Sequence, residues 1–183
     1  MATSGRTTAS DVQALLQDST LAGEWALDAS QSTIGLRSKS MWGLAPVKGV
    51  FREVTGQGTV SPAGEVSGTI SVAAASVDTK MKKRDAHLRS SDFFDSDNFP
   101  AITFAVDGLA PASDGATVTG RLTVRDRTQP VSVPAQVSVI TPDEVRLDAE
   151  VRVNRADFGL TWNQMGMASM LSTITVHAVF GKR

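Results

Sequence analysis

Apolar and polar side chains alternate without interruption over residues 145–154, and this alternation constrains the fold more than any other feature of the sequence. The apolar set consists of Val145, Leu147, Ala149, Val151 and Val153. Between them stand Arg146, Asp148, Glu150, Arg152 and Asn154. Successive side chains of a β-strand point to opposite faces of the sheet, so a period of two places the whole apolar set on one face. The segment therefore predicts a strand with one dry face and one face in water.

Other parts of the chain show the same period of two. Three long segments have it, at residues 118–124, 131–139 and 174–180. Shorter strand candidates, separated by Gly, Pro, Asp or Ser, lie at 24–27, 34–39, 47–51, 56–60, 66–72 and 101–106. Strands that follow one another with few helices between them favour hairpins over parallel crossovers. We therefore predict an all-β fold of about eight antiparallel strands that curls into a barrel or a sandwich.

Two segments fall outside this pattern. After Ser10, the residues Val12, Leu15 and Leu16 share one helical face, so we predict a short helix with Ser10 as its N-cap. Residues 76–100 are too charged for a strand and fit a short helix followed by a turn. Long ordered excursions in small domains often cover an open end or carry function. We divide the chain into an N-terminal extension, residues 1–23, and a barrel domain, residues 24–183.

Composition excludes several classes of function. Apolar residues make up 41% and charged residues 20% of the 183 residues, which is enough for a core and a wetted surface. The 18 Lys and Arg residues against 19 Asp and Glu residues leave no excess of positive charge for nucleic acid. No cysteine is present for disulfides or thiolate catalysis. The longest apolar run in 1–23 has three residues, 14–16, so we expect no export signal and a cytoplasmic protein.

The carboxylates Asp92, Asp95 and Asp97 lie close together and could be taken for a calcium loop. An EF-hand would need Gly and Glu where this chain has Pro100 and Val106. We interpret the three Asp residues as turn and capping residues, and we expect no metal site.

The two histidines also have a structural interpretation. His87 lies near Ser90, but no nucleophile elbow or oxyanion motif accompanies the pair, so we expect no catalytic residue. His177 falls on the wet face of its strand. The basic cluster of Lys80, Lys82, Lys83 and Arg84 is interpreted as a solvated helix start, with transient contact to a membrane surface as the alternative.

Large apolar residues are also common outside the predicted strands. They are Met41, Trp42, Phe93, Phe94, Phe99, Phe158, Trp162, Met165, Met167, Met170 and Leu171. Aromatic and Met side chains in loops can seal a core, form a homodimer interface, or line the mouth of a cavity. An eight-stranded barrel is wide enough either to be filled by side chains or to hold one ligand, so pattern alone leaves these interpretations open.

Seven short motifs occur in one order along the chain. They are WALD at 25–28, VKGVF at 47–51, SVDT at 76–79, RDAHLRSSDFF at 84–94, FPAITF at 99–104, GRLTV at 120–124 and NRADFG at 154–159. Together they resemble the YceI-like family, from about Trp25 to the C-terminus. The resemblance implies a lipocalin-like antiparallel β-barrel that encloses a polyisoprenoid, as in quinone-type lipids or their precursors.

The resemblance implies binding or carriage of this lipid rather than catalysis, without a cofactor. From the alternation and the apolar loops we predict the residues that contact the ligand. They are Phe51, Phe104, Leu122, Val151, Phe158 and Trp162 in the lining, with Trp42, Met165 and Met167 near an opening.

Two alternatives stay open at this point. One is a closed-core structural or partner-binding dimer, which requires a filled barrel. The other is an enzyme acting on an isoprenoid lipid, with Arg84, Asp85 and His87 as its polar groups.

Overall fold

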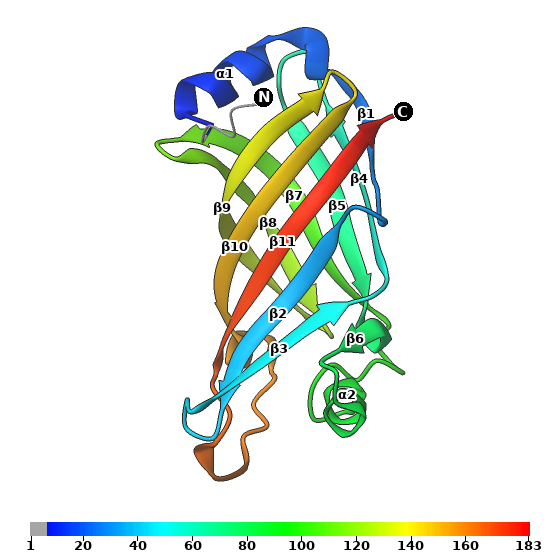
Figure 1. The fold of residues 1–183 in the computed structure, drawn as a ribbon, viewed down its shortest axis with the longest axis vertical. Helices are drawn as coiled ribbons and strands as arrows, with labels where there is room; N and C mark the ends of the chain where they lie inside the picture. The colour runs from blue at the N-terminus through cyan, green and yellow to red at the C-terminus, as the bar shows by residue number, and fades with distance from the viewer. Residues whose placement is uncertain (1–6) are drawn as a thin grey trace.

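The computed structural model describes residues 7–183, so the first six residues of the N-terminal extension lie outside the described part. It shows an elongated β-barrel whose long strands are steeply tilted relative to the long axis of the barrel (Figure 1). One short helix covers one end of the barrel, and a second lies beside the opposite end (Figure 1). None of the described helices is long and apolar enough to span a membrane.

Within residues 7–183, eight antiparallel strands close into a ring through the pairing of β1 with β11. In ring order they are β1 (Gly23–Leu27), β4 (Val54–Val60), β5 (Val66–Ala73), β7 (Ala101–Ala112), β8 (Gly115–Val124), β9 (Arg127–Thr141), β10 (Glu144–Asn154) and β11 (Leu171–Lys182). The predicted all-β, lipocalin-like antiparallel barrel is confirmed.

The remaining strands extend the wall beside β11. They are β2 (Thr33–Ser40), β3 (Ala45–Phe51) and β6 (Val77–Asp78). Strand β11 pairs with β1 near its end, where Phe180 lies opposite Leu27, and with β2 further back, where His177 lies opposite Thr33. The long strand β11 thus pairs with both β1 and β2 along the same edge. Strand β3 then pairs with β2 and extends the wall.

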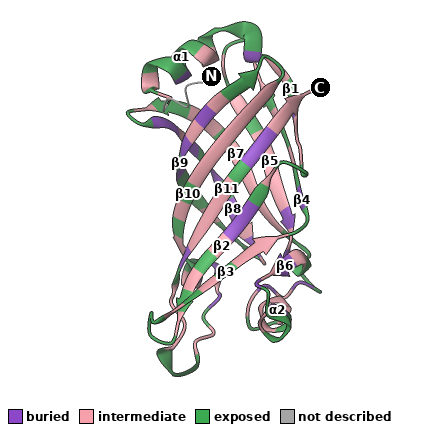
Figure 2. Cartoon of the chain, viewed as in Figure 1, coloured by how far each residue is buried: buried purple, intermediate pink, exposed green. Residues whose placement is uncertain are grey.

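The alternation predicted over residues 145–154 places its apolar side chains inside the barrel. All five apolar residues of the 145–153 row line the barrel interior, and the polar residues between them do not. Figure 2 shows that buried and half-buried residues make up much of the strands, with exposed residues between them, and that α1 and the loops are largely exposed. The row predicted over 131–139 ends earlier than expected, because β9 runs past the barrel interior and leaves Val139 39% and Ile140 49% exposed.

Helix α1 (Ala9–Gln17) covers one end of the barrel. Its N-cap is Thr8 rather than Ser10, because Thr8 and Asp11 form a capping box that satisfies backbone N–H groups in both directions. Val12 is 2% exposed and packs with Ala116 and Val137 of the wall. The turn η1 (Ser19–Leu21) follows, and its Leu21 carbonyl accepts a 3.0 Å hydrogen bond from the Trp25 indole.

The opposite end is built from two long connections. The first contains η2 (Ala74–Ser76), β6, and α2 (Lys82–Arg89), so the helix predicted within residues 76–100 is present. The second joins β10 to β11 and contains η3 (Arg155–Phe158) and η4 (Gln164–Gly166). Phe94 of the first connection and Phe158 of the second join one buried cluster with Leu122 and Val124 of β8.

Leu122→Glu tests the assignment of strand faces. Leu122 is 7% exposed and points inward, so the substitution buries an unpaired carboxylate and should lower the free energy of unfolding by about 3 kcal/mol or more. Urea unfolding measures the change. The matched control is Thr119→Glu on the exposed face of the same strand, which should change the stability by less than about 0.5 kcal/mol. Equal stability of the two variants would show that the inward face is wrongly assigned.

Candidate functional site

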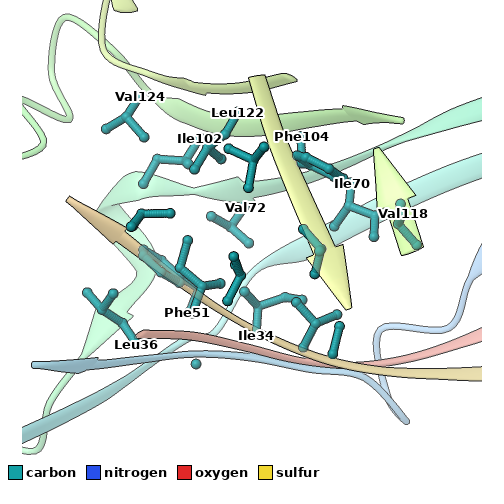
Figure 3. Close-up of a pocket in the computed structure, with 18 of the residues that line it drawn as sticks. Ile34, Leu36, Phe51, Ile70, Val72, Ile102, Phe104, Val118, Leu122 and Val124 are labelled. Carbon is teal, nitrogen blue, oxygen red and sulfur yellow. The ribbon is translucent and has the colours of Figure 1, made fainter. Parts of the chain in front are cut away.

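The barrel interior holds a cavity of about 460 Å³. This volume lies within the range of small-molecule binding sites, which is roughly 300–1,000 Å³. Figure 3 shows labelled side chains from several strands converging on it: Ile34, Leu36, Phe51, Ile70, Val72, Ile102, Phe104, Val118, Leu122 and Val124. The cavity is the opposite of the filled barrel that a closed-core protein requires.

The α1 end of the cavity is apolar. Val12, Leu15 and Leu16 of α1 line it together with Leu21 of η1. Val145 and Phe180 of the facing strands also contribute to the lining. This end of the cavity therefore offers hydrocarbon contacts, and α1 lies across it.

Arg155, the first residue of η3, dominates the α2 end. Its side chain is buried, with 7% of the residue exposed, and it lines the cavity. Nε donates to the Ser169 carbonyl at 2.9 Å, and Nη1 donates to the carbonyls of Leu160 and Trp162, each at 2.7 Å. Nη2 is shielded from solvent and has no hydrogen-bond partner among residues 7–183. Burial lowers the pKa of Arg155, because removal from water disfavours the charged form, but an Arg side chain stays charged at neutral pH.

Three aromatic rings surround this end of the cavity. The rings of His87 and Trp162 meet edge to face with centroids 4.4 Å apart, and Phe93 lies 5.1 Å from His87 and 5.4 Å from Trp162. The Arg155 guanidinium lies 5.5 Å from the Phe93 ring centre. Edge-to-face contacts and a cation over a ring are favourable, so the four side chains hold α2 against the β10–β11 connection.

Arg84 brings a second guanidinium to the lining. Its Nε donates to the Thr79 hydroxyl at 2.8 Å and its Nη2 to the Thr79 carbonyl at 2.9 Å. The Thr79 hydroxyl in turn donates to Asp85 at 2.6 Å, and the Thr79 N–H donates to the same carboxylate oxygen at 2.8 Å. Arg84 and Asp85 are thus both fixed by Thr79, but only Arg84 reaches the cavity.

The charges of the lining are of one sign. Its ionisable residues within the described part of the chain are Lys39, Arg84, His87 and Arg155, and no Asp or Glu is among them. Arg84 and His87 lie on α2, Arg155 contacts the same aromatic rings, and Lys39 lies near the end of β2. The cavity therefore has an apolar end under α1 and a cationic end beside α2.

Six of the nine predicted contact residues line the cavity: Phe51, Phe104, Leu122, Val151, Phe158 and Trp162. Trp42, Met165 and Met167 do not, since they lie on the β2–β3 and β10–β11 connections outside it. Trp42 is 66% and Met165 79% exposed. The Trp42 N–H donates to the Met167 carbonyl at 3.2 Å, so the two connections are joined there.

Arg155 and the α1 residues were missed as contacts by the sequence reasoning. An Arg directly after an amphipathic strand has the pattern of a surface residue, and its burial depends on carbonyl groups that come later in the chain. The α1 contacts had a signal, because Val12, Leu15 and Leu16 form the apolar face of the predicted helix.

His87 and the carboxylates of Asp92 and Asp95 have hydrogen-bond partners within the chain. His87 Nε2 lies 2.9 Å from an Asp92 carboxylate oxygen, whereas the Ser90 hydroxyl donates to the His87 carbonyl and not to the ring. The Asp95 carboxylate accepts from Asn98. In residues 7–183 no cluster of His, Asp and Glu is arranged to hold a metal ion.

The basic cluster of residues 80–84 is partly bound within the chain. Lys80 pairs with Asp78 at 3.3 Å, and Arg84 is held by Thr79. The Lys80 backbone N–H and the Arg52 guanidinium lower the pKa of Asp78 to about 2.

His177 is exposed and contacts Asp148 at 2.5 Å, which agrees with its predicted place on the wet face.

A family model described as the YceI-like domain matches residues 25–180. The chain belongs to the YceI-like family. It is 28% identical over 160 residues to Protein YceI of Salmonella arizonae and of Salmonella enteritidis, and the match covers 82% of this chain and 83% of each relative.

Solved structures of YceI-like proteins share the fold. BcnA of Burkholderia cenocepacia has a TM-score of 0.76 at 25% identity, with 84% of this chain and 98% of that chain covered. A polyisoprenoid binding domain from Saccharophagus degradans, implicated in plant cell wall breakdown, has a TM-score of 0.72 at 17% identity, with 87% and 98% covered. The Campylobacter jejuni YCEI protein gives a TM-score of 0.66 at 20% identity, with 75% and 85% covered.

Arg155→Met tests the structural role of the buried guanidinium. The substitution leaves three loop carbonyls without their donor, and it should lower the free energy of unfolding by about 2–4 kcal/mol. Hydrogen exchange of residues 159–170 should rise more than exchange in β8. The control is Arg152→Met, an exposed Arg of β10, which should change neither. Unchanged exchange in Arg155→Met would show that the loop holds itself.

Proposed function

We propose that this protein binds a long-chain apolar lipid inside its barrel, most specifically a polyisoprenoid of the quinone type or a precursor, and sequesters or carries it. One observation carries the proposal: an open cavity lined by apolar side chains extends from the α1 end to the α2 end of the barrel. The polyisoprenoid is supported by the fold shared with the binding domain of Saccharophagus degradans and by the sequence resemblance.

The physical chemistry of the lining suits such a ligand. Burial of hydrocarbon contributes about 0.8 kcal/mol per methylene, hence roughly 4 kcal/mol per isoprene unit of about five carbons. A few units would hold the lipid tightly with no charged contact along the tail. The branched side chains of Val72, Ile102 and Ile174 in the wall present the methyl-rich surface that a methyl-branched tail can pack against.

A binding role needs no reacting group in the cavity. An enzyme acting on an isoprenoid would need an acid, base or nucleophile aimed at a reacting atom. Asp85 is bound to Thr79 and does not line the cavity, and the Ser90 hydroxyl donates to the His87 carbonyl rather than to the His87 ring. We therefore favour carriage over catalysis.

Ala149→Phe tests the binding proposal by placing a ring in the cavity. Ala149 lines the interior midway along β10, so the larger side chain should exclude a long tail. We expect mass spectrometry of an organic extract to show a stoichiometric polyisoprenoid with the natural chain, and at least tenfold less with Ala149→Phe. Ala149→Val, which adds only two methyl groups, should keep the ligand. If an unrelated barrel prepared alongside yields the same lipids in the same amounts, the binding proposal is wrong.

We also propose that the tip formed by the β2–β3 and β10–β11 connections contacts a membrane surface transiently. Five large apolar side chains are exposed there: Met41 at 53%, Trp42 at 66%, Leu44 at 82%, Met165 at 79% and Leu171 at 54%. Residues 37–48 and 159–171 contain Arg37, Lys39 and Lys48 but no Asp or Glu. An exposed apolar patch with basic neighbours suits an anionic lipid surface. The tip lies at the α2 end of the barrel, the cationic end of the cavity (Figure 1).

Replacement of Trp42 and Met165 by Ser should reduce co-sedimentation with anionic phosphatidylglycerol vesicles at least threefold, since it removes one large exposed apolar side chain from each of the two connections. Val139→Ser with Ile140→Ser is the matched control, because these exposed apolar residues lie at the opposite end. Equal sedimentation of the two double variants would contradict membrane contact by the tip. In that case light scattering would test the homodimer interface that the sequence leaves open.

Two predictions from the sequence stay predictions. The homodimer and the cytoplasmic location are part of the proposed function, and both are consistent with a carrier that meets membranes only briefly. The membrane contact is moved from residues 80–84, where Lys80 and Arg84 have partners within the chain, to the tip.

A further inference from the structure

We infer that the α2 end of the cavity is a binding site for an anionic head group, a phosphate or a carboxylate, held by the guanidinium groups of Arg155 and Arg84. This inference rests on the proposed function, because it assigns the orientation and the chemical class of the lipid in the same cavity. The tail would run from this site towards α1. A lipid with an uncharged head group, a quinone included, would then be a weaker ligand than a phosphate or carboxylate of equal chain length, so the inference narrows the proposed function to the anionic precursors.

Arg155 supplies the first argument. A buried polar nitrogen almost always has a hydrogen-bond partner in a folded protein. Nε and Nη1 of Arg155 make three hydrogen bonds to loop carbonyls, whereas Nη2 makes none although the residue is only 7% exposed and lines the cavity. The side chain is therefore held rigidly by two of its nitrogens, and the third, which is shielded from solvent, lacks the partner that a buried nitrogen normally has.

Charge supplies the second argument. Arg155 makes no ion pair, and its three partners are neutral carbonyl oxygens. A buried charge is costly unless an opposite charge or several hydrogen bonds compensate it. The lining within residues 7–183 has no carboxylate to serve as counterion. An anionic ligand would supply one at the place where the cavity lacks it.

Arg84 supplies the third argument, because it adds a second fixed cation to the same end. It stands one helical turn from His87 on α2, and residues three apart lie on one helix face. His87 in turn contacts Trp162, whose carbonyl binds Arg155. Planar guanidinium groups suit phosphate and carboxylate oxygens, since their N–H groups match the spacing of two oxygens.

The nearby carboxylates lie outside the lining of the cavity. Asp85 is bound to the N–H and hydroxyl of Thr79 and does not line the cavity. Asp92 is bound to His87 and is also outside the lining. The α1 end has no charged side chain in the lining, so the two ends differ in the way that an amphiphile with one charged head requires.

The first experiment needs no mutation. The binding of geranylgeranyl phosphate, geranylgeranoic acid and geranylgeraniol to delipidated natural protein is measured by quenching of Trp fluorescence at two salt concentrations. The three probes share nearly the same tail. We expect the phosphate and the acid to bind at least tenfold more tightly than the alcohol. The ratio of phosphate to acid affinity distinguishes which anion the site prefers.

The second experiment locates the site. Arg84→Gln and Arg155→Lys should each reduce the preference for phosphate over alcohol at least threefold. A purely structural role would weaken both probes equally and leave the preference unchanged. Arg89→Gln is the matched control, since Arg89 lies on α2 outside the cavity lining and its loss changes the net charge by the same amount. If Arg155→Lys does not fold, the preference for phosphate over alcohol, compared between the natural protein and Arg84→Gln, still tests the inference.

The outcomes separate this inference from the proposed function. If no probe binds, the carriage of long-chain lipids is itself wrong. If the alcohol binds as tightly as the phosphate and the acid, the barrel binds lipid but the cationic end does not select the head group, and the inference is overturned. If Arg89→Gln lowers the preference as much as Arg84→Gln, the effect comes from net charge and not from the site.

Discussion

The closure of the antiparallel wall through β1 and β11 is the constraint on which the other features of the molecule depend. Each of the eight ring strands has a neighbour on both sides, so most backbone polar groups of the ring are paired within the wall, whereas the outer edge of β3 is paired only at Val50 and Phe51, with β6. The inward side chains then have no polar backbone to cover and can be apolar throughout. A wall that is satisfied in this way can surround an empty apolar space without exposing unpaired donors or acceptors to it.

Because the interior of the barrel is a cavity, the close packing of apolar side chains is found at the two ends of the barrel and within its wall. At one end, Val12 of α1 packs with Ala116 and Val137. At the other, Phe94 and Phe158 pack with Leu122. In the wall between them, Gly120 makes room for a large ring, because a Cβ there would lie 2.6 Å from Cζ of Phe104. The ends therefore do more than close the barrel, since they contain much of its tightly packed core.

The strands and the two helices could be predicted because their signals are local. A period of two over residues 145–154 depends only on neighbours in the chain, and it placed five residues correctly on the inward face. The signal fails where placement depends on distant partners. Trp42 and Met167, which we place near an opening, lie on two connections that are joined by a backbone hydrogen bond, and this contact has no signature in the sequence. Arg155 shows the opposite: it is a charged residue, yet it is buried, because carbonyl groups of residues 160–169 accept its hydrogen bonds.

The buried Arg155 also shows why this end of the barrel is not built for stability alone. Two of its nitrogens would be enough to hold the β10–β11 connection, and a third buried nitrogen without a partner adds a desolvation cost. Polar networks that are only partly satisfied are less stable than apolar packing of the same volume. The α1 end shows that this chain can close a barrel with Val and Leu side chains alone. A guanidinium at the α2 end is therefore best explained by what it can bind, and an amphiphile whose tail fills the apolar length of the cavity would bring its head group to that place.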